Sequence, residues 1–364
     1  MDLFSPVRIG PHELSNRFVM APMARARCDD NRVPTARVGE YYAQRASVGL
    51  IVSEASSVSP LSVSRPYASA MYLDAHAAGW RKVTDGIHAA GGVIFQQLYH
   101  LGRKTDPTRM PDGARPVAPS EIAANGQVAG ANGPVDFALP RALKTEEIAG
   151  VVAEFRHAAV NARAAGMDGV EVHGANTYLI DQFLRDGTNK RSDCYGGSVE
   201  NRARFLLEVV DAVSEIFGAD CVGVRISPHA RGDGIDDSDP AATFGHVAAA
   251  LDARRVAYLH LIEAMVPDIP QAPAPGCAPL LPIVRQAFRG PLIVNGAYTR
   301  ETASSLIAAG AAELVAFGAL MIANPDLVER FRLNAPLNEP DRSSFHNGGV
   351  AGYTDYPFLQ DAAG

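Results

Sequence analysis

The chain alternates between short apolar runs and longer segments in which apolar residues recur every three to four positions. A continuous apolar run, without regular polar positions, is typical of a parallel strand that is covered on both faces. Such runs predict eight strands, at residues 17–23, 49–55, 92–100, 169–175, 221–227, 256–264, 290–297 and 313–319.

The segments between these runs predict helices. Residues 145–166 begin with Thr145 as an expected N-cap, carry two glutamates in the first turn and end on a glycine, which are common helix boundary signals. Residues 198–218 begin with Ser198 and also end on a glycine. Further helices are expected at 35–46, 76–90, 240–255, 299–310 and 325–332.

Eight strands that alternate with helices indicate an α/β protein, and more specifically a (β/α)8 TIM barrel. The alternative, a doubly wound sheet, usually has a glycine-rich turn after its first strand, whereas residues 21–27 contain no glycine. We therefore expect a single domain over residues 1–364, with residues 1–16 as a cap on the barrel floor. Long loops follow the third and sixth strands, at 101–144 and 264–280, on the face where barrels build active sites.

Composition narrows the range of partners. The net charge of −7 and the absence of a basic stripe argue against binding to nucleic acid or to an acidic membrane. The four cysteines are far apart and form no C-x-x-C pair, which favours reduced thiols over a disulfide framework or a zinc site. Neither a signal peptide nor an apolar run near the ~20 residues of a membrane span is visible, so a cytoplasmic protein is expected.

The residues expected at the carboxyl ends of the strands are polar but contain few carboxylates. A glycosidase needs two facing carboxylates, a Schiff-base aldolase needs a lysine at a strand end, and a divalent metal needs a cluster of His, Asp and Glu. None of these sets is present. Amide, imidazole, guanidinium, phenol and backbone N–H groups remain, and these suit a cofactor that carries out the difficult step. They include Gln97, Tyr99, His100, His173, Asn176, Arg225 and Asn295.

Several motifs resemble those of one family along nearly the whole chain. The most specific is EVHGANTYLIDQFLRDGTNKRSDCYGGSVENRARF at 171–205, with NRFVMAPM at 16–23 and QLYHLGR at 97–103. Shorter matches are SEAS at 53–56, PVAPS at 116–120, VGVRISP at 222–228, GAYT at 296–299, IANPDL at 322–327 and GYTDYP at 352–357. On these residues the chain resembles the old yellow enzyme family of FMN-dependent ene-reductases.

The resemblance implies catalytic roles for His173, Asn176 and Tyr178. The first two match the pair of donors that hold the oxygen of an enone, enal or nitroalkene, and a donor pair stabilises an oxygen that gains negative charge. Tyr178 matches the family's proton donor, since a phenol is protonated at neutral pH and can protonate a carbanion-like carbon.

The resemblance also implies the cofactors, FMN with NADPH or NADH as reductant, and the residues around them. Tyr67, Tyr99 and Tyr353 match substrate-wall aromatics, and the C-terminal segment 333–364 is expected to contribute to that wall. The residues expected to bind FMN are Pro22, Met23, Ala24, Ala55, Gln97, Arg225, Gly296, Ala297, Gly318 and Ala319.

Two positions depart from the family pattern. Ala24 stands where members usually carry threonine or cysteine, so a hydrogen bond to the flavin is missing. Ala319 stands where they carry an arginine that grips the phosphate, for which Arg300 is a candidate substitute. Because these two side chains are missing, an alternative remains open, namely a non-redox isomerase or cyclase on the same barrel. A ligand-binding barrel without catalysis is a third hypothesis. The sequence leaves open the physiological substrate, the choice of NADPH or NADH, and whether the protein is a monomer or a homodimer.

Overall fold

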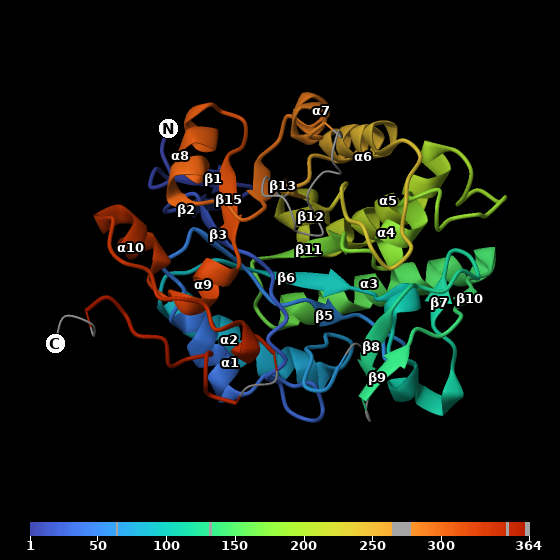
Figure 1. The fold of residues 1–364 in the computed structure, drawn as a ribbon, viewed down its shortest axis with the longest axis horizontal. Coiled ribbons are helices and arrows are strands. Elements are labelled where there is room, and N and C mark those ends of the chain that lie inside the picture. The colour runs from blue at the N-terminus through green and yellow to red at the C-terminus, as the bar shows by residue number, and fades with distance from the viewer. Residues whose placement is uncertain (63–64, 131–132, 264–277, 347–348, 361–364) are drawn as a thin grey trace.

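Eight parallel strands form a closed barrel in the computed structural model, which describes residues 1–62, 65–130, 133–263, 278–346 and 349–360 (Figure 1). The strands are β3 (Phe18–Met20), β4 (Leu50–Val52), β6 (Ile94–Tyr99), β11 (Gly169–Gly174), β12 (Val222–Ile226), β13 (Tyr258–Ile262), β14 (Leu292–Asn295) and β15 (Leu314–Phe317). Neighbours in this order pair in parallel, and the pairing of β15 with β3 closes the ring. Each strand lies inside one of the predicted apolar runs, so the predicted (β/α)8 barrel is confirmed.

Helices surround the barrel and follow the strands in sequence. They are α1 (Ala36–Ala43), α2 (Asp74–Ala89), α3 (Thr145–Ala164), α4 (Leu179–Leu184), α5 (Val199–Phe217), α6 (Pro240–Arg254), α7 (Leu281–Ala287), α8 (Arg300–Ala308), α9 (Ala319–Ala323) and α10 (Leu327–Leu333). The sequence did not predict α4, α7 or α9. The helices α4 and α9 have only six and five residues, too few to display a helical period, and α7 begins inside a proline-rich stretch.

The helix caps follow from single side chains. Ser198 Oγ accepts the Asn201 N–H and starts α5, as predicted, and Gly218 ends this helix with a φ of 85°. Thr145 is not the N-cap of α3 but its first residue. Lys144 takes the cap position because Glu147 Oε2 accepts its N–H at 2.7 Å.

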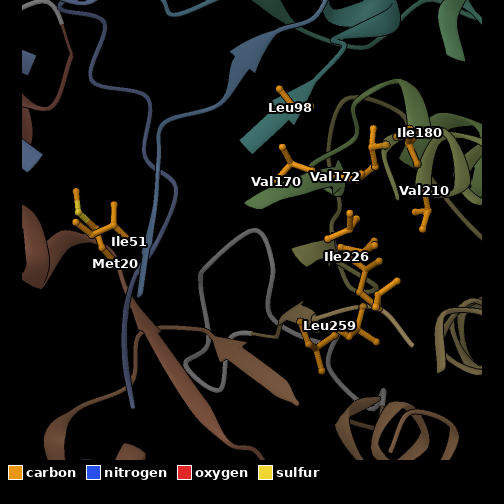
Figure 2. Close-up of a cluster of buried hydrophobic side chains, with 14 of the residues drawn as sticks. Met20, Ile51, Leu98, Val170, Val172, Ile180, Val210, Ile226 and Leu259 are labelled. Atoms are coloured by element: carbon orange, nitrogen blue, oxygen red, sulfur yellow. The ribbon is translucent and has the colours of Figure 1, made fainter. Parts of the chain in front are cut away.

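Alternate residues of each strand face opposite sides of the barrel wall. In β11, Val170 and Val172 belong to the large buried cluster between the strands and the helices, together with Val210 of α5 (Figure 2). The residues in alternation with them, Glu171 and His173, therefore face the barrel interior. This alternation places polar side chains inside the barrel without opening the apolar layer outside it.

Aromatic rings fill the lower part of the barrel interior. Phe95 of β6 and Tyr258 of β13 lie with ring centroids 5.7 Å apart. Their register partners are Gly169 and Gly223, where an added Cβ would come within 2.5 Å and 2.1 Å of the respective rings. Glycine at these two positions therefore makes room for the rings, as it does where strands must admit a close neighbour.

A short antiparallel hairpin lies against the amino ends of the strands. It consists of β1 (Val7–Ile9) and β2 (His12–Leu14), and both strands contribute buried apolar side chains to the cluster around Phe95. His12 Nε2 lies 3.3 Å from the carbonyl oxygen of Asp168, which directly precedes β11. The aromatic rings and this hairpin together close the floor of the barrel.

The long segment after β6 contains short elements of its own. They are the 3-10 helices η1 (Gly102–Lys104), η2 (Pro107–Arg109) and η3 (Pro111–Gly113) and the strands β7 (Val117–Ala118), β8 (Gln127–Gly130), β9 (Gly133–Asp136) and β10 (Arg141–Ala142). Elsewhere lie β5 (Ser56–Ser57), η4 (Ala219–Cys221) and η5 (Arg342–Ser344).

Most of the second predicted loop, residues 264–277 with Cys277, lies outside the described residues. The other cysteines, Cys28, Cys194 and Cys221, are free thiols. In the described part of the chain, no helix combines the length and the apolar character that a membrane span requires.

Candidate active site

The carboxyl ends of the barrel strands carry most of the predicted site residues. The strands are buried along almost their whole lengths, whereas the predicted residues beyond β3, β4 and β15 are partly exposed. This face of the barrel is therefore open to a ligand. The residues are Pro22, Met23 and Ala24 after β3, Ala55 after β4, Gln97 and Tyr99 in β6, His173 in β11, Arg225 in β12, and Gly318 and Ala319 after β15.

His173 is a neutral imidazole with a defined tautomer. Its side chain is buried, and its Nδ1 accepts the Ala175 N–H at 3.2 Å. Burial, with the nearby charges of Arg225 and His260, holds the pKa of His173 well below its usual value. A neutral imidazole whose Nδ1 accepts a hydrogen bond carries its proton on Nε2. His173 Nε2 is therefore a donor.

Asn176 places a second donor next to the first. Its Nδ2 lies 3.4 Å from His173 Nε2. Since both atoms carry protons, they do not satisfy each other, and the pair lacks an acceptor. An oxygen atom that reaches both would accept two hydrogen bonds, which is the arrangement that stabilises a developing oxyanion.

The turn that carries Asn176 has a strained backbone. The φ angles of Asn176 and Thr177 are 57° and 64°, in the left-handed region that asparagine tolerates and β-branched threonine rarely adopts. The Asn176 N–H donates to Ser227 Oγ at 2.8 Å, and the Thr177 N–H donates to Asp181 Oδ2 at 2.9 Å. Strain of this kind persists where surrounding bonds determine the conformation, and it is concentrated at functional sites.

A buried ion pair fixes these partners of the turn. Arg185 Nε lies 2.7 Å from Asp181 Oδ1, with both side chains at most 2% exposed. Arg185 Nη2 also donates to the Ser227 carbonyl oxygen at 2.6 Å. One arginine therefore holds both residues that bind the turn, and the position of Asn176 is set by this network as well as by β11.

Tyr178 completes the group of polar side chains on this turn. Its ring centroid lies 4.9 Å from that of His173 and 5.6 Å from that of Tyr99. Lys104 Nζ lies 5.3 Å from the Tyr178 ring centroid and pairs with Asp233 at 2.6 Å. The Tyr178 hydroxyl forms no hydrogen bond with any residue that the structure describes. It is therefore available to a ligand at the barrel mouth.

Arg225 is a buried cation with a free donor. Its Nη2 donates to Asn295 Oδ1 at 2.8 Å, whereas its Nε is buried without a partner. Gln97 Nε2 donates to Glu171 at 2.6 Å, and Glu171 pairs with His260 Nδ1 at 2.9 Å. Burial raises the pKa of Glu171, but His260 and Arg225 outweigh it and bring this pKa below its usual value. The Glu171 carboxylate therefore balances Arg225, whose Nε can bind a polar ligand.

A cavity of about 460 Å³ lies beyond the ends of β14 and β15. The predicted residues Ala297, Gly318 and Ala319 line it, and Gly296 lines an adjoining cavity of about 620 Å³. An added Cβ on Gly318 would find only Met23 Sδ within 4 Å, at 3.5 Å. The backbone at this position is therefore accessible to a bound group.

Three polar residues of this face were not expected from the sequence. Lys104 directly follows a matched motif and could have been found from it. Arg342 lines the 460 Å³ cavity, and His346 Nδ1 donates to the Ala24 carbonyl oxygen at 2.8 Å. Both lie in an irregular C-terminal stretch, where no period or strand end marks them. Among the described residues, no group of three His, Cys, Asp or Glu side chains is arranged to hold a metal ion.

The three predicted wall tyrosines lie in different surroundings. Tyr99 contacts the site, with its ring centroid 6.4 Å from that of His173. Tyr67 is 43% exposed and lines a separate cavity of about 490 Å³. Tyr353 is fully buried and stacks on Tyr41 with centroids 4.2 Å apart. This stack anchors the C-terminal stretch, so Tyr353 supports the barrel mouth without a ring contact to His173.

His100, at the end of β6, makes the stability of the fold depend on pH. Burial lowers its pKa from 6.5 to about 4. In the unfolded chain His100 becomes protonated below about pH 6.5, whereas in the folded chain it stays neutral down to about pH 4. The folded state therefore loses stability as the pH falls from 6.5 to 4. The shift corresponds to ~3 kcal/mol at most.

Urea denaturation of the wild type and of His100→Asn tests this effect. Between pH 7.5 and 4.5, the wild type should lose ~2–3 kcal/mol more of its free energy of unfolding than the variant. Asparagine keeps an acceptor for the Gly102 N–H. Equal losses would contradict this assignment.

Comparison with known proteins gives consistent matches over the whole chain. The profile of the NADH:flavin oxidoreductase / NADH oxidase family matches residues 2–338. A probable flavin mononucleotide-dependent alkene reductase of Leishmania infantum is 44% identical over 362 residues, which cover 98% of this chain and 97% of that protein. The 12-oxophytodienoate reductase 7 of Oryza sativa subsp. japonica is 42% identical over 373 residues, 98% of this chain and 94% of its own.

Solved structures agree with these matches. Morphinone reductase superposes with a TM-score of 0.94 at 45% identity, over 100% of this chain and 98% of the other. The old yellow enzyme homologue from Zymomonas mobilis has a TM-score of 0.95 at 40% identity, over 99% of this chain and 100% of the other. A further structure of morphinone reductase is a complex with tetrahydroNAD.

Proposed function

Because this chain belongs to the NADH:flavin oxidoreductase family, the family of old yellow enzyme, we propose that it reduces the activated C=C bond of enones, enals or nitroalkenes. It is an NAD(P)H-dependent FMN oxidoreductase of the ene-reductase type. The observation that carries the proposed substrate class is the pair of donors at His173 and Asn176, which lie 3.4 Å apart without an acceptor. A conjugated carbonyl or nitro oxygen supplies that acceptor.

The residues at the barrel mouth fit FMN. Arg225 offers a buried Nε without a partner, which suits a polar edge of the isoalloxazine ring. Pro22, Met23 and Ala24 form a half-exposed run along which a planar ring could lie. The 460 Å³ cavity, with the open backbone at Gly318, has room for a phosphate. When bound, FMN supplies the hydride for the reduction.

Side chains at the end of β11 and in the turn that follows it would orient the substrate for that hydride. His173 and Asn176 donate to its oxygen and stabilise the negative charge that develops there. His173 donates as a neutral imidazole, because burial lowers its pKa. Tyr178 lies next to His173, with 4.9 Å between ring centroids, and its hydroxyl donates the proton that the substrate carbon needs.

A visible spectrum of the purified protein with added FMN tests the proposal. We expect a bound flavin band that bleaches on anaerobic addition of NADPH or NADH and returns with 2-cyclohexenone. A protein that takes up FMN but does not reoxidise with any enone, enal or nitroalkene would contradict the proposed substrate class. A protein that takes up no FMN would contradict the cofactor and redirect attention to non-redox chemistry at the same turn.

Ala24→Thr should raise the reduction potential of the bound flavin. Threonine would add a hydroxyl that donates to the flavin edge, and one such bond contributes ~0.5–1.5 kcal/mol, which corresponds to ~10–30 mV for two electrons. Reduction by NADPH should become faster and reoxidation by enone slower. Ala24→Val, which has the shape of threonine without the hydroxyl, is the control for both the potential and the rates. Identical potentials in the two variants would mean that residue 24 does not tune the flavin.

A further inference from the structure

The cavity of about 460 Å³ beyond β14 and β15 contains one arginine to which no role has yet been assigned. Arg342 lines this cavity with Ala297, Gly318 and Ala319. The residue is exposed, and its guanidinium forms no hydrogen bond or ion pair with any residue that the structure describes. Most arginines around the barrel mouth, by contrast, are engaged, as Arg225 is with Asn295. A guanidinium without a protein partner at the wall of this cavity is available to an anionic ligand.

The backbone that carries Arg342 is fixed on both sides. The N–H of Asp341 donates to the Tyr356 hydroxyl at 2.9 Å, and the Ser344 carbonyl oxygen accepts from Arg27 Nη2 at 2.9 Å. This C-terminal stretch, red in Figure 1, also lies next to α9, since Asn338 Nδ2 donates to the Ala323 carbonyl oxygen at 2.8 Å. The backbone of Arg342 is therefore anchored, and its side chain lines the cavity from this fixed segment.

We propose that Arg342 binds the phosphate group of FMN and replaces the arginine that is absent at Ala319. The proposal rests on the proposed function, which supplies the cofactor. A guanidinium matches phosphate geometry and binds it through two parallel N–H donors. Arg342 and the backbone at Gly318, where an added Cβ would meet only Met23 Sδ within 4 Å, would hold the phosphate from two sides of the cavity.

Arg300 is the alternative source of the charge, and its surroundings argue against it. Its Nη1 donates to Asn334 Oδ1 at 3.3 Å. It lines a different cavity, of about 260 Å³, that Ala319 and Gly318 do not line. Arg300 therefore serves as a matched control, since it is an arginine in the neighbouring helix that faces another cavity.

Affinities for FMN and for riboflavin, which lacks the phosphate, separate this proposal from the proposed function. Dissociation constants are measured by quenching of flavin fluorescence on titration with wild type, Arg342→Ala, Arg342→Lys and Arg300→Ala. We expect Arg342→Ala to bind FMN about 10- to 150-fold more weakly, the range for a lost hydrogen bond to a charged group, with riboflavin affinity unchanged. Arg342→Lys should be intermediate, Arg300→Ala should equal wild type, and A319R introduced into Arg342→Ala should restore FMN affinity.

Each other result overturns the proposal in a recognisable way. Wild-type FMN affinity in Arg342→Ala would remove the role of Arg342 and leave the flavin assignment standing. Equal losses for FMN and riboflavin would show that Arg342 supports the fold of the mouth rather than the phosphate, and thermal unfolding of the variant would register that loss. A wild type that binds neither flavin would refute the proposed function together with this inference.

Discussion

Replacing Tyr178 with phenylalanine should slow the reoxidation of the reduced protein by 2-cyclohexenone about 10²- to 10⁴-fold, the usual contribution of a positioned general acid. The substitution removes only a hydroxyl that has no hydrogen-bond partner in the described structure, so the ring can keep its contacts with His173 and Tyr99. Reduction of the flavin by NADPH requires no proton from this residue and should change by no more than a few-fold. Stopped-flow measurement of the two half-reactions separates these effects.

Tyr99→Phe is the matched comparison for Tyr178→Phe. It removes the neighbouring phenol, whose ring lies 5.6 Å from that of Tyr178. If proton donation belongs to Tyr178, the Tyr99 variant loses much less of the reoxidation rate. A Tyr178→Phe protein that keeps a tenth or more of the wild-type reoxidation rate would show that the proton comes from elsewhere, with solvent or Tyr99 as the next candidates.

Loss of either oxygen-binding donor should have an effect of similar size. His173→Ala and Asn176→Ala should each lower kcat/KM for 2-cyclohexenone about 10²- to 10³-fold, as removal of one donor to a developing oxyanion does. The two donors lie 3.4 Å apart and would serve one oxygen, so the double variant should lose less than the product of the single losses. Losses that multiply fully would indicate that the residues act on different groups.

His173→Asn distinguishes hydrogen bonding from packing. Asparagine keeps an N–H donor but loses the imidazole ring, which packs near Tyr178 and Tyr99. We expect this variant to recover at least part of the activity that His173→Ala loses. FMN affinity should stay at the wild-type level in all these variants, because neither residue is assigned to the cofactor, and a drop in FMN affinity would contradict that division of roles.

The barrel could be predicted from sequence because its determinants are local. The eight apolar runs report burial on both faces, and every barrel strand lies within one of them. Helices with clear caps, such as the one that starts after Ser198, were also predictable. The His173–Asn176–Tyr178 turn was found because its residues are neighbours in sequence and belong to a specific motif.

Features that depend on distant contacts could not be predicted in this way. Tyr353 matched a wall residue by motif, but the structure buries it in a stack on Tyr41, which lies on α1. Arg300 was the expected substitute for the arginine absent at Ala319, yet Arg342 lines the cavity beside Ala319. Both outcomes depend on how the C-terminal stretch wraps back over the barrel, and no local period encodes that path.

The aromatic floor of the barrel also limits the direction from which ligands can reach the proposed site. Phe95 and Tyr258, with the hairpin beneath them, close the amino end of the barrel. If the protein acts as proposed, the reductant and the electron acceptor would both have to approach the flavin from the carboxyl ends of the strands. The two ligands would then compete for one route to the flavin instead of entering from opposite ends.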